Sequence, residues 1–292
     1  TAFRRRAEQA GLTFVFSGSN DLSIAKDVAR RADVVVALVH TTAGEAFDRA
    51  HLQVDDNGDA LVEVMAAMRP TVALVVAPGA VLLPWRDEVA AAALMFLGGE
   101  QTGKAWASMV FGDVAPSGKL PLVIPVDRAS TIEPSSKVTA YSEGLFTSYR
   151  SSTIRSAFPF GHGLSYAEFA YEAAAPVSPT SCSTPAVVCV QVKVRHVGPA
   201  DGRAWGPSAA AEVAQAYIEF PPEAEEPKLV LRGFHKTPLL GVGEVKLIDF
   251  GFTARDLSIF KSGTWQLQKR VTVHIGASST DLRMSLPLVV PN

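Results

Sequence analysis

Apolar positions follow two different patterns along the chain. Up to about residue 125, short continuous runs of Val, Leu and Ala alternate with segments in which apolar residues recur at helical spacing. Continuous apolar strands are typical of a parallel sheet that helices cover on both faces. The first half therefore predicts an α/β layered sandwich with a mostly parallel sheet.

The expected elements of this half can be placed from caps and spacing. They are a helix over 2–11 closed by Gly11, a short apolar run over 12–18, a helix over 21–32 with Asp21 as N-cap, a strand over 33–39, a helix over 56–68, a strand over 71–79, and a helix followed by an apolar run over 85–99. The order of these elements is that of an α/β domain.

The second half alternates with a period of two. Valine occupies every even position from 188 to 194, while Gln191, Lys193 and Arg195 lie between. About seven strand-length pieces follow one another in roughly 105 residues, which predicts an antiparallel β-sandwich. Phe234 and Trp265 are expected in its core.

Four regions are expected from these patterns and from composition. They are an α/β sandwich domain over 1–126, an ordered strap rich in Ser, Pro, Gly and aromatic residues over 127–173, a linker over 174–187, and the β-sandwich over 188–292.

Composition limits the possible partners. A net charge of −2 on 292 residues gives no indication of nucleic-acid or anionic-membrane binding, because both need a basic excess. No apolar stretch reaches the roughly 18–20 uncharged residues that span a bilayer. The first residues lack the apolar stretch of a signal peptide and begin as if inside a helix, so we expect a fragment or a processed chain.

The two cysteines, Cys182 and Cys189, are seven positions apart. Such a pair can close a small loop in an oxidising compartment, but two cysteines do not define a disulfide scaffold. The sequence leaves this bond open.

No cofactor or metal is predicted. No Gly-x-Gly-x-x-Gly follows a strand, and Gly103-Lys104 lacks the spacing of a phosphate loop. The six histidines lack metal-ligand spacing, and Ser165 lacks the flanking glycines of a nucleophile elbow.

A glutamate follows the strand expected over 33–39. Gly44 and Glu45 lie where a parallel strand ends, and functional loops of parallel sheets lie at such ends. The residues alone leave two interpretations open. In the first, Glu45 is a catalytic acid. In the second, it has a structural role, as the cap of the next helix or in a surface ion pair with Arg49, because most exposed carboxylates take no part in catalysis.

Six blocks of the sequence form a recognisable set. They are GEQTGKAWASMVFGDVAPSGKLPLVIP (99–125), YSEGLFTSYR (141–150), FPFGHGLSYAEFAY (158–171), AAEVAQAYIEFP (210–221), LRGFHK (231–236) and GASSTDLR (276–283). In this order they resemble the C-terminal part of the family 3 glycoside hydrolases, the β-glucosidase family, in its fungal-type secreted form. The resemblance implies an α/β sandwich domain followed by an all-β immunoglobulin-like (fibronectin type III-like) sandwich.

The resemblance also assigns roles in the loop after the first strand. Family members carry Gly-Glu-Gly-(Phe/Tyr) or Glu-Gly-x-Asp-Arg there, and the glutamate is the general acid/base. Carried over, Glu45 is catalytic, while Phe47, Asp48 and Arg49 bind substrate. This loop is shorter than in many fungal members, and Ala46 replaces the family's usual glycine. If that position takes a positive φ, alanine costs about 1 kcal/mol and can re-aim the glutamate.

The family's nucleophile is an aspartate of a (β/α)8 barrel, and nothing in residues 1–292 resembles that barrel or the opening strands of the α/β domain. The resemblance therefore implies two partners: a β-glucoside or short β-glucan oligosaccharide, and a barrel domain supplied by another segment or chain. It also implies a secreted protein. A barrel-less binding or structural subunit is the rival function. An unrelated carbohydrate-binding sandwich protein is a third, which the order of the blocks opposes.

Overall fold

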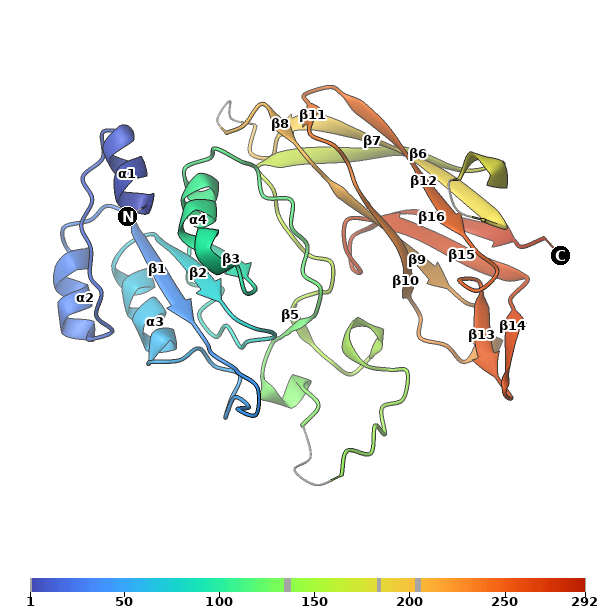
Figure 1. Cartoon of the computed structure of the whole chain (residues 1–292), viewed down its shortest axis with the longest axis horizontal. Coiled ribbons are helices and arrows are strands. Elements are labelled where there is room, and N and C mark those ends of the chain that lie inside the picture. The colour runs from blue at the N-terminus through green and yellow to red at the C-terminus, as the bar shows by residue number, and fades with distance from the viewer. Residues whose placement is uncertain (1, 134–137, 183–184, 203–205, 292) are drawn as a thin grey trace. The chain divides into compact units, whose positions relative to one another are not determined.

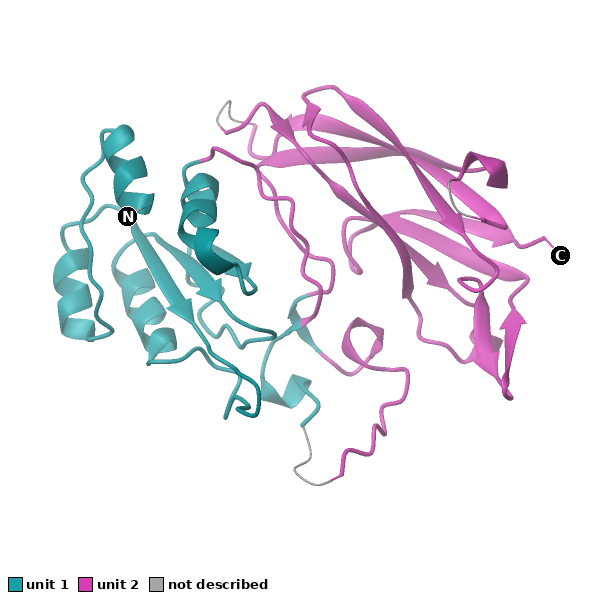
Figure 2. Cartoon of the chain, viewed as in Figure 1, with its two compact units in different colours: residues 1–111, 124–133, 155–158 teal, residues 112–123, 134–154, 159–292 magenta. Residues whose placement is uncertain are grey.

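The computed structural model describes residues 2–133, 138–182, 185–202 and 206–291. The chain divides into two compact units, drawn in different colours in Figure 2. Unit 1 comprises residues 1–111, 124–133 and 155–158, and unit 2 comprises residues 112–123, 134–154 and 159–292.

Unit 1 is an α/β domain built on a small parallel sheet (Figure 1). Its sheet has the order β1-β2-β3, and both strand pairs are parallel. Its elements are α1 (Ala2–Gln9), α2 (Leu22–Ala29), β1 (Val35–His40), α3 (Gly58–Met68), β2 (Thr71–Val76), β3 (Ala91–Met95), η1 (Gly99–Gln101), α4 (Thr102–Val110), β4 (Ile124–Pro125), η2 (Arg128–Ser130) and β5 (Ser156–Phe158).

Local signals predicted the ends of the first helices well. The Asp21 carboxylate accepts hydrogen bonds from the backbone N–H groups of Ser23 and Ile24, so its role as N-cap of α2 is confirmed. Gly11 follows α1 with a φ of 69°, the left-handed conformation with which helices commonly end.

One segment of unit 1 differs from the expectation. Residues 85–90 form turns instead of a helix, and the alanine-rich Ala91–Met95 pairs with β2 as strand β3. Alanine favours helix strongly, but here pairing along β2 outweighs that preference. The short apolar run over 12–18 pairs with no strand in the part of the chain that the structure describes.

Helices cover the sheet where its side chains are buried. Ala25 and Ala29 of α2 pack with Met65 of α3, and Gly58 brings the start of α3 against Val39 of β1. A Cβ atom on Gly58 would lie 3.2 Å from Cγ1 of Val39, so this close approach requires glycine.

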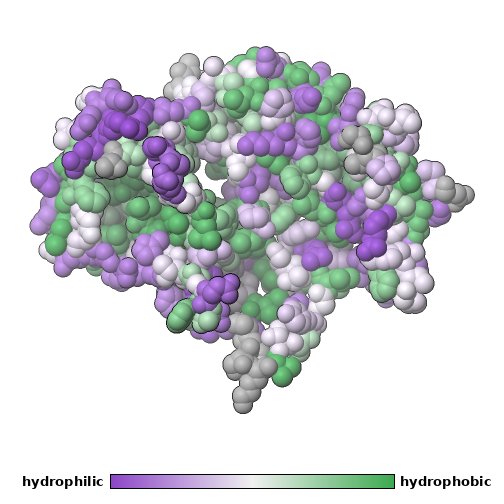
Figure 3. All heavy atoms as spheres, viewed as in Figure 1, coloured by the Kyte–Doolittle hydropathy of each residue, from purple (hydrophilic) through white to green (hydrophobic). Residues whose placement is uncertain are grey.

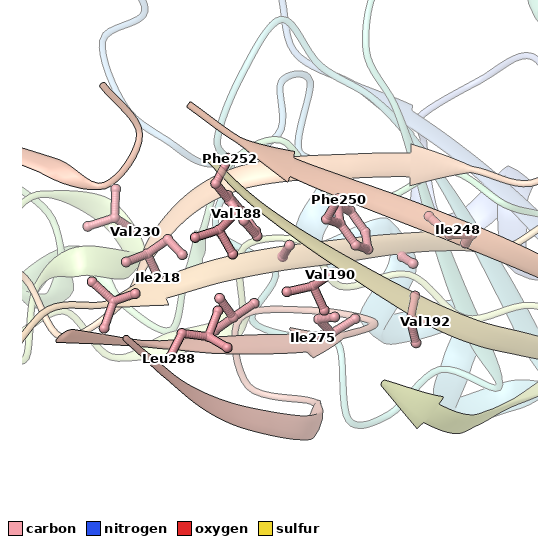
Figure 4. Close-up of a cluster of buried hydrophobic side chains, with 14 of the residues drawn as sticks. Val188, Val190, Val192, Ile218, Val230, Ile248, Phe250, Phe252, Ile275 and Leu288 are labelled. Atoms are coloured by element: carbon pink, nitrogen blue, oxygen red, sulfur yellow. The ribbon is translucent and has the colours of Figure 1, made fainter. Parts of the chain in front are cut away.

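Unit 2 is a β-sandwich of two antiparallel sheets, with the orders β10-β9-β15-β16 and β12-β7-β6. Side chains from both sheets meet in one core, including Val190, Ile218, Phe250 and Ile275 (Figure 4). Its elements are η3 (Ser148–Arg150), β6 (Ala167–Val177), η4 (Pro179–Ser181), β7 (Val188–Pro199), β8 (Ala209–Ala210), β9 (Val213–Glu219), η5 (Pro222–Ala224), β10 (Val230–Lys236), β11 (Leu240–Gly241), β12 (Val245–Phe252), β13 (Ser258–Lys261), β14 (Thr264–Leu267), β15 (Arg270–Gly276) and β16 (Leu282–Val289). The predicted fold class is confirmed for both halves.

The expected linker over 174–187 needs a correction in its first part. Residues 174–177 are the end of β6, which pairs with β7 at ten positions. The alanines and Pro176 did not indicate a strand in the sequence, and the proline is tolerated because β6 lies at the sheet edge.

Directly beyond β6, Cys182 and Cys189 form a disulfide, with Cα atoms 6.0 Å apart.

The expected strap over 127–173 is divided between the units. Residues 127–133 and 155–158 belong to unit 1, where β4 pairs with β5, and residues 138–154 and 159–166 belong to unit 2. In unit 2, Gln215 of β9 donates hydrogen bonds to the carbonyls of Gly161 (3.1 Å) and Ala277 (2.8 Å). The hydroxyl of Tyr217 in turn donates to Gln215, so a buried network holds the strap on the sandwich.

Two aromatic residues expected in the sandwich core lie at the surface. Phe234 is 71% exposed and Trp265 is 46% exposed. Trp265 packs beside Phe260 on the hairpin of β13 and β14, and the Arg255 guanidinium lies over its ring. Both expectations were wrong, because aromatic residues in edge strands and hairpins can find partners outside the core.

Removal of the buried Gln215 amide tests the strap network. Gln215→Leu leaves two carbonyls and the Tyr217 hydroxyl without their partner, so we expect a loss of about 2–4 kcal/mol in the unfolding free energy of unit 2. Gln191→Leu, which removes an exposed amide bonded to Asp249, should change it by less than about 0.5 kcal/mol. Hydrogen exchange of β9 amides measures both values, and equal losses would refute the network.

Candidate functional site

The loop that carries Glu45 begins at the carboxyl end of β1. Residues 44–47 form a tight turn, in which the Gly44 N–H donates to the Phe47 carbonyl (3.3 Å) and the Phe47 N–H donates to the Gly44 carbonyl (3.0 Å). Glu45 and Ala46 are the two central residues. The carboxylate is thus presented at the tip of a short closed turn.

Ala46 is held in a left-handed conformation, with a φ of 63°. A turn with positive φ at its third position normally has glycine or asparagine there. For alanine the left-handed region costs roughly 1–2 kcal/mol. The condition set by the sequence, a positive φ at the position of the family's glycine, is therefore met.

Asp55 closes the base of the loop. Its backbone N–H donates to the His40 carbonyl (2.8 Å), at the end of β1. Its carboxylate accepts hydrogen bonds from the Thr42 N–H (2.8 Å), the Thr42 hydroxyl (3.0 Å) and the Thr41 hydroxyl (3.2 Å). We call this set the Asp55 clamp. It ties both ends of the 41–55 loop together and limits where Glu45 can point.

The clamp also determines the charge of Asp55. Desolvation alone would raise the pKa of this carboxyl, but the hydrogen bonds from Thr42 and Thr41 outweigh it and hold the pKa below its usual value. Asp55 is therefore a firmly ionised acceptor. Nothing in the sequence pattern indicated this role, because the clamp joins residues 13 and 14 positions apart.

Glu45 has neither of the two structural roles considered from the sequence. Asn57 occupies the N-cap position of the next helix, α3, and no ion pair joins Glu45 to Arg49 among the described residues. Glu45, Phe47 and Asp48 are exposed, and Phe47 is 77% exposed. These three side chains are accessible to a ligand.

Arg49 differs from its neighbours in the loop, because it is half-buried. A Cβ atom built on Gly79, in the loop after β2, would lie 3.8 Å from Nη2 of Arg49. Its Nη1 atom is buried without a hydrogen-bond partner in the part of the chain that the structure describes. An unpaired buried donor costs about 1–3 kcal/mol, and a carboxylate or hydroxyl oxygen would relieve that cost.

A polar hollow of about 300 Å³ lies beside the clamp, lined by residues 51 and 53–57 together with Asp59. Burial raises the pKa of Asp59, although the Trp85 indole N–H donates to its carboxylate (2.8 Å) and opposes the shift. Trp85 itself is fully buried and Trp106 nearly so, which favours core roles over sugar stacking. Asp55 and Asp59 both have structural partners.

Among the described residues, no group of three or more His, Cys, Asp or Glu side chains is arranged to hold a metal ion. Within the same ranges, no helix has the length and apolar character needed to cross a membrane.

Fold and site together define a class: an α/β domain with a carboxylate-bearing loop after a parallel strand, followed by a β-sandwich. Residues 1–166 match the profile of the glycosyl hydrolase family 3 C-terminal domain, and residues 212–279 match that of the fibronectin type III-like domain. The chain belongs to glycosyl hydrolase family 3, as the six sequence blocks indicated.

Relatives of the chain are named β-glucosidases. It is 32% identical to thermostable beta-glucosidase B of Acetivibrio thermocellus, over 88% of this chain and 35% of that protein. It is 32% identical to probable beta-glucosidase L of Aspergillus terreus, over 97% of this chain and 42% of that protein. The crystal structure of beta-D-glucoside glucohydrolase from Trichoderma reesei superposes with a TM-score of 0.89 at 28% identity, over 99% of this chain and 44% of that one. The chain therefore spans less than half the length of these relatives.

The clamp has a testable dependence on pH. Since the pKa of Asp55 is lower in the folded than in the unfolded protein, the clamp stabilises the fold at neutral pH, and this contribution is lost as the pH falls through the acid range below about 4. Asp55→Asn should lower the unfolding free energy of unit 1 by about 1–3 kcal/mol at pH 7 and by much less at pH 3.

The neighbouring Asp56→Asn is the control for the clamp. Asp56 is exposed, and we expect a change of less than about 0.5 kcal/mol at either pH. Denaturation followed through exchange of α3 amides measures each variant. A loss for Asp55→Asn that is the same at pH 7 and pH 3 would contradict the ionised clamp.

The left-handed conformation of Ala46 predicts that a substitution by glycine increases the stability of unit 1. Ala46→Gly removes the strain at φ 63° and should stabilise unit 1 by about 0.5–1 kcal/mol, net of the greater freedom of glycine in the unfolded chain. Ala43→Gly, at an exposed position of the same loop with negative φ, should destabilise by a similar amount. Equal signs for the two variants would mean that Ala46 is not strained.

Proposed function

We propose that this chain supplies the general acid/base of a retaining β-glucosidase, and that Glu45 is that residue. The observation that carries the proposal is the placement of Glu45: it lies after a parallel strand, at the tip of a turn anchored by the Asp55 clamp, without a structural partner among the described residues. The relatives are named β-glucosidases, and these names support the proposed substrate class.

The proposed reaction has two steps, each with one proton transfer. In the first, a carboxylate attacks the anomeric carbon while the protonated Glu45 carboxyl gives its proton to the leaving oxygen as the glycosidic bond breaks. In the second, the Glu45 carboxylate takes a proton from a water molecule. The oxygen of that water attacks the anomeric carbon and displaces the carboxylate that became bound to the sugar in the first step. Retaining enzymes hold the two carboxyls about 5–5.5 Å apart.

The neighbours of Glu45 suit the binding of a sugar. The exposed Phe47 ring offers an apolar face, which sugar C–H groups can contact. The Asp48 carboxylate can accept hydrogen bonds from hydroxyl groups, and the unpartnered Nη1 of Arg49 can donate one. We propose that these three residues bind the β-glucoside or short β-glucan oligosaccharide.

The nucleophile is proposed to lie outside residues 1–292, in a barrel domain supplied by another segment or chain. Among the described residues, Asp55 is committed to the clamp and Asp59 to Trp85, and neither is hydrogen-bonded to Glu45. The relatives are long enough to contain such a domain, because the parts of them that match this chain make up only 35–44% of their lengths.

We also propose that the protein is secreted. The disulfide between Cys182 and Cys189 supports this, because disulfides persist in oxidising compartments and are rare in the cytosol.

A binding or structural subunit without catalysis is the second candidate. Ala46 favours it, because strain at φ 63° beside Glu45 can turn the carboxylate away from the position that a glycine-containing loop would give it. Activity of the enzyme completed with its missing part distinguishes the two functions.

The decisive variant is Glu45→Ala. We define the completed enzyme as this chain preceded by the part of the Trichoderma reesei glucohydrolase that lies before the matched region. The isolated chain should not hydrolyse an aryl β-glucoside, and the completed enzyme should. Glu45→Ala should slow the completed enzyme by roughly 10²–10⁴-fold, and azide should restore part of the rate.

Glu63→Ala is the matched control, since Glu63 is an exposed glutamate on α3 of the same unit. It should leave the rate unchanged, and azide should have no effect on it. Turnover by the isolated chain would place the nucleophile within residues 1–292. An unchanged rate for Glu45→Ala would show that Glu45 is not the general acid/base.

A further inference from the structure

Hydrophilic and hydrophobic side chains are mixed over the surface of the sandwich that Figure 3 shows. A site on such a surface is distinguished by how its side chains are paired, and three polar side chains on one sheet are paired in a chain. The Nε2 atom of His274 lies 2.6 Å from a carboxylate oxygen of Glu219, and its Nδ1 atom lies 2.8 Å from the hydroxyl oxygen of Ser285. We call these three residues the Ser285 relay.

The register of the sheet brings the relay together. Strand β15 lies between β9 and β16, and His274 of β15 is directly opposite Ser285 of β16. Glu219 of β9 is opposite Thr272, two positions before His274 on the same face of β15. Opposite residues have Cβ atoms about 4.5–5.5 Å apart and diagonal ones about 7–8 Å, so both contacts of the histidine follow from the strand pairing.

The donors and acceptors available to the relay fix the direction of its hydrogen bonds. An ionised carboxylate can only accept, so Nε2 of His274 carries the proton that Glu219 accepts. In a neutral imidazole the other nitrogen is then an acceptor, and the Ser285 hydroxyl donates to Nδ1. His274 is therefore held as a base toward the serine, and the carboxylate can stabilise the imidazolium that forms when the base takes a proton.

The serine is the accessible member of the relay. Ser285 is exposed, whereas the side chains of His274 and Glu219 are 13% and 36% exposed. The base is thus largely shielded from water, while its hydroxyl partner can meet a ligand. A hydroxyl within hydrogen-bond reach of a base, which a third group orients, is the arrangement that activates a nucleophile.

A hollow of about 290 Å³ lies beside the relay and includes Glu219 in its lining. Thr272 and Pro287, the opposite pair next to the relay on the same face of β15 and β16, also line it, together with Arg270. The other lining residues are apolar. An apolar acyl group fits such a hollow, and the Thr272 hydroxyl and the Arg270 guanidinium are donors for a carbonyl oxygen.

We propose that Ser285 is the nucleophile of a second hydrolytic activity, which acts on carboxylic esters with a small apolar acyl group. In this activity His274 is the general base, and Glu219 is the residue that positions it. The activity does not depend on Glu45 or on the completed enzyme, because the relay and the hollow belong to unit 2.

The proposed reaction is an acyl transfer in two steps. In the first, the Ser285 oxygen attacks the carbonyl carbon while its proton moves to Nδ1 of His274, and the ester C–O bond breaks as that proton passes to the departing alcohol oxygen. In the second, His274 takes a proton from water, whose oxygen attacks the acyl carbon. The bond to Ser285 then breaks, and the proton returns to the serine oxygen. One ester and one water give one carboxylic acid and one alcohol.

Covalent labelling tests whether Ser285 is activated. The chain of 292 residues is treated with a fluorophosphonate, which modifies activated serine hydroxyls, and peptide mass spectrometry locates the modified residue. We expect Ser285 to react at least about 100-fold faster than Ser178, an exposed serine of the same unit whose hydroxyl is bonded to Thr180. Equal rates for the two serines would overturn the proposal.

Hydrolysis of p-nitrophenyl acetate by the same chain tests the roles of the serine and the base. Ser285→Ala and His274→Gln should each slow turnover at least about 100-fold. His235→Gln removes an exposed histidine of β10 and should leave the rate unchanged, so it corrects for the reaction of any surface imidazole with this ester. Turnover that survives in Ser285→Ala, equal effects of the two histidine variants, or labelling of Ser285 without turnover would each contradict the activity.

The positioning role of Glu219 has its own readout. Glu219→Gln keeps a side chain of the same size but removes the charge, so both labelling and turnover should fall at least about 10-fold. Glu219→Asp, which keeps the charge, should retain more of both rates than Glu219→Gln does. The midpoint of thermal unfolding is measured for each variant. A purely structural glutamate would lower that midpoint and leave both rates of the folded protein unchanged, and this result would refute its role in the relay.

Discussion

The parallel pairing of β1 with β2 is the constraint on which the rest of unit 1 depends. It runs without a break from Val35 opposite Thr71 to His40 opposite Val76, so both strands end at the same edge of the sheet. The Glu45 loop leaves β1 there, and Gly79 follows β2 beside Arg49. A carboxylate and a half-buried guanidinium therefore come from one edge, although the sequence separates the two loops by a whole helix.

The same pairing decides how the loop is held. Since even-numbered backbone groups of β1 face away from β2, the His40 carbonyl is free to accept the Asp55 N–H, and the Asp55 carboxylate then reaches back to Thr41 and Thr42. The loop is fixed at its base by ionic hydrogen bonds and strained near its tip at Ala46. Rigidity at the base restricts the orientations open to the Glu45 carboxyl. The strain at Ala46 acts on the same carboxyl and is the feature that favours the second candidate function.

Sequence patterns predicted those parts of the protein in which local preference and tertiary structure agree. The Val-rich run of β1, the Asp21 cap and the alternation in β7 belong to this group. The patterns failed where tertiary contacts prevailed: the alanines of β3 pair as a strand, the proline-containing end of β6 looked like a linker, and Trp265 stacks with Arg255 at the surface. In the site, resemblance indicated Glu45, but neither the clamp nor the unpartnered Arg49 could be predicted, because both depend on contacts between distant residues.

The central claim is that Glu45 protonates the leaving group, and its most direct test is the dependence of rate on the leaving group. An acid helps most when the departing oxygen is strongly basic. In the completed enzyme, Glu45→Gln should therefore slow hydrolysis of an alkyl β-glucoside far more than that of a dinitrophenyl β-glucoside, whose leaving group needs no proton. If both substrates slow by the same factor, Glu45 is not the general acid.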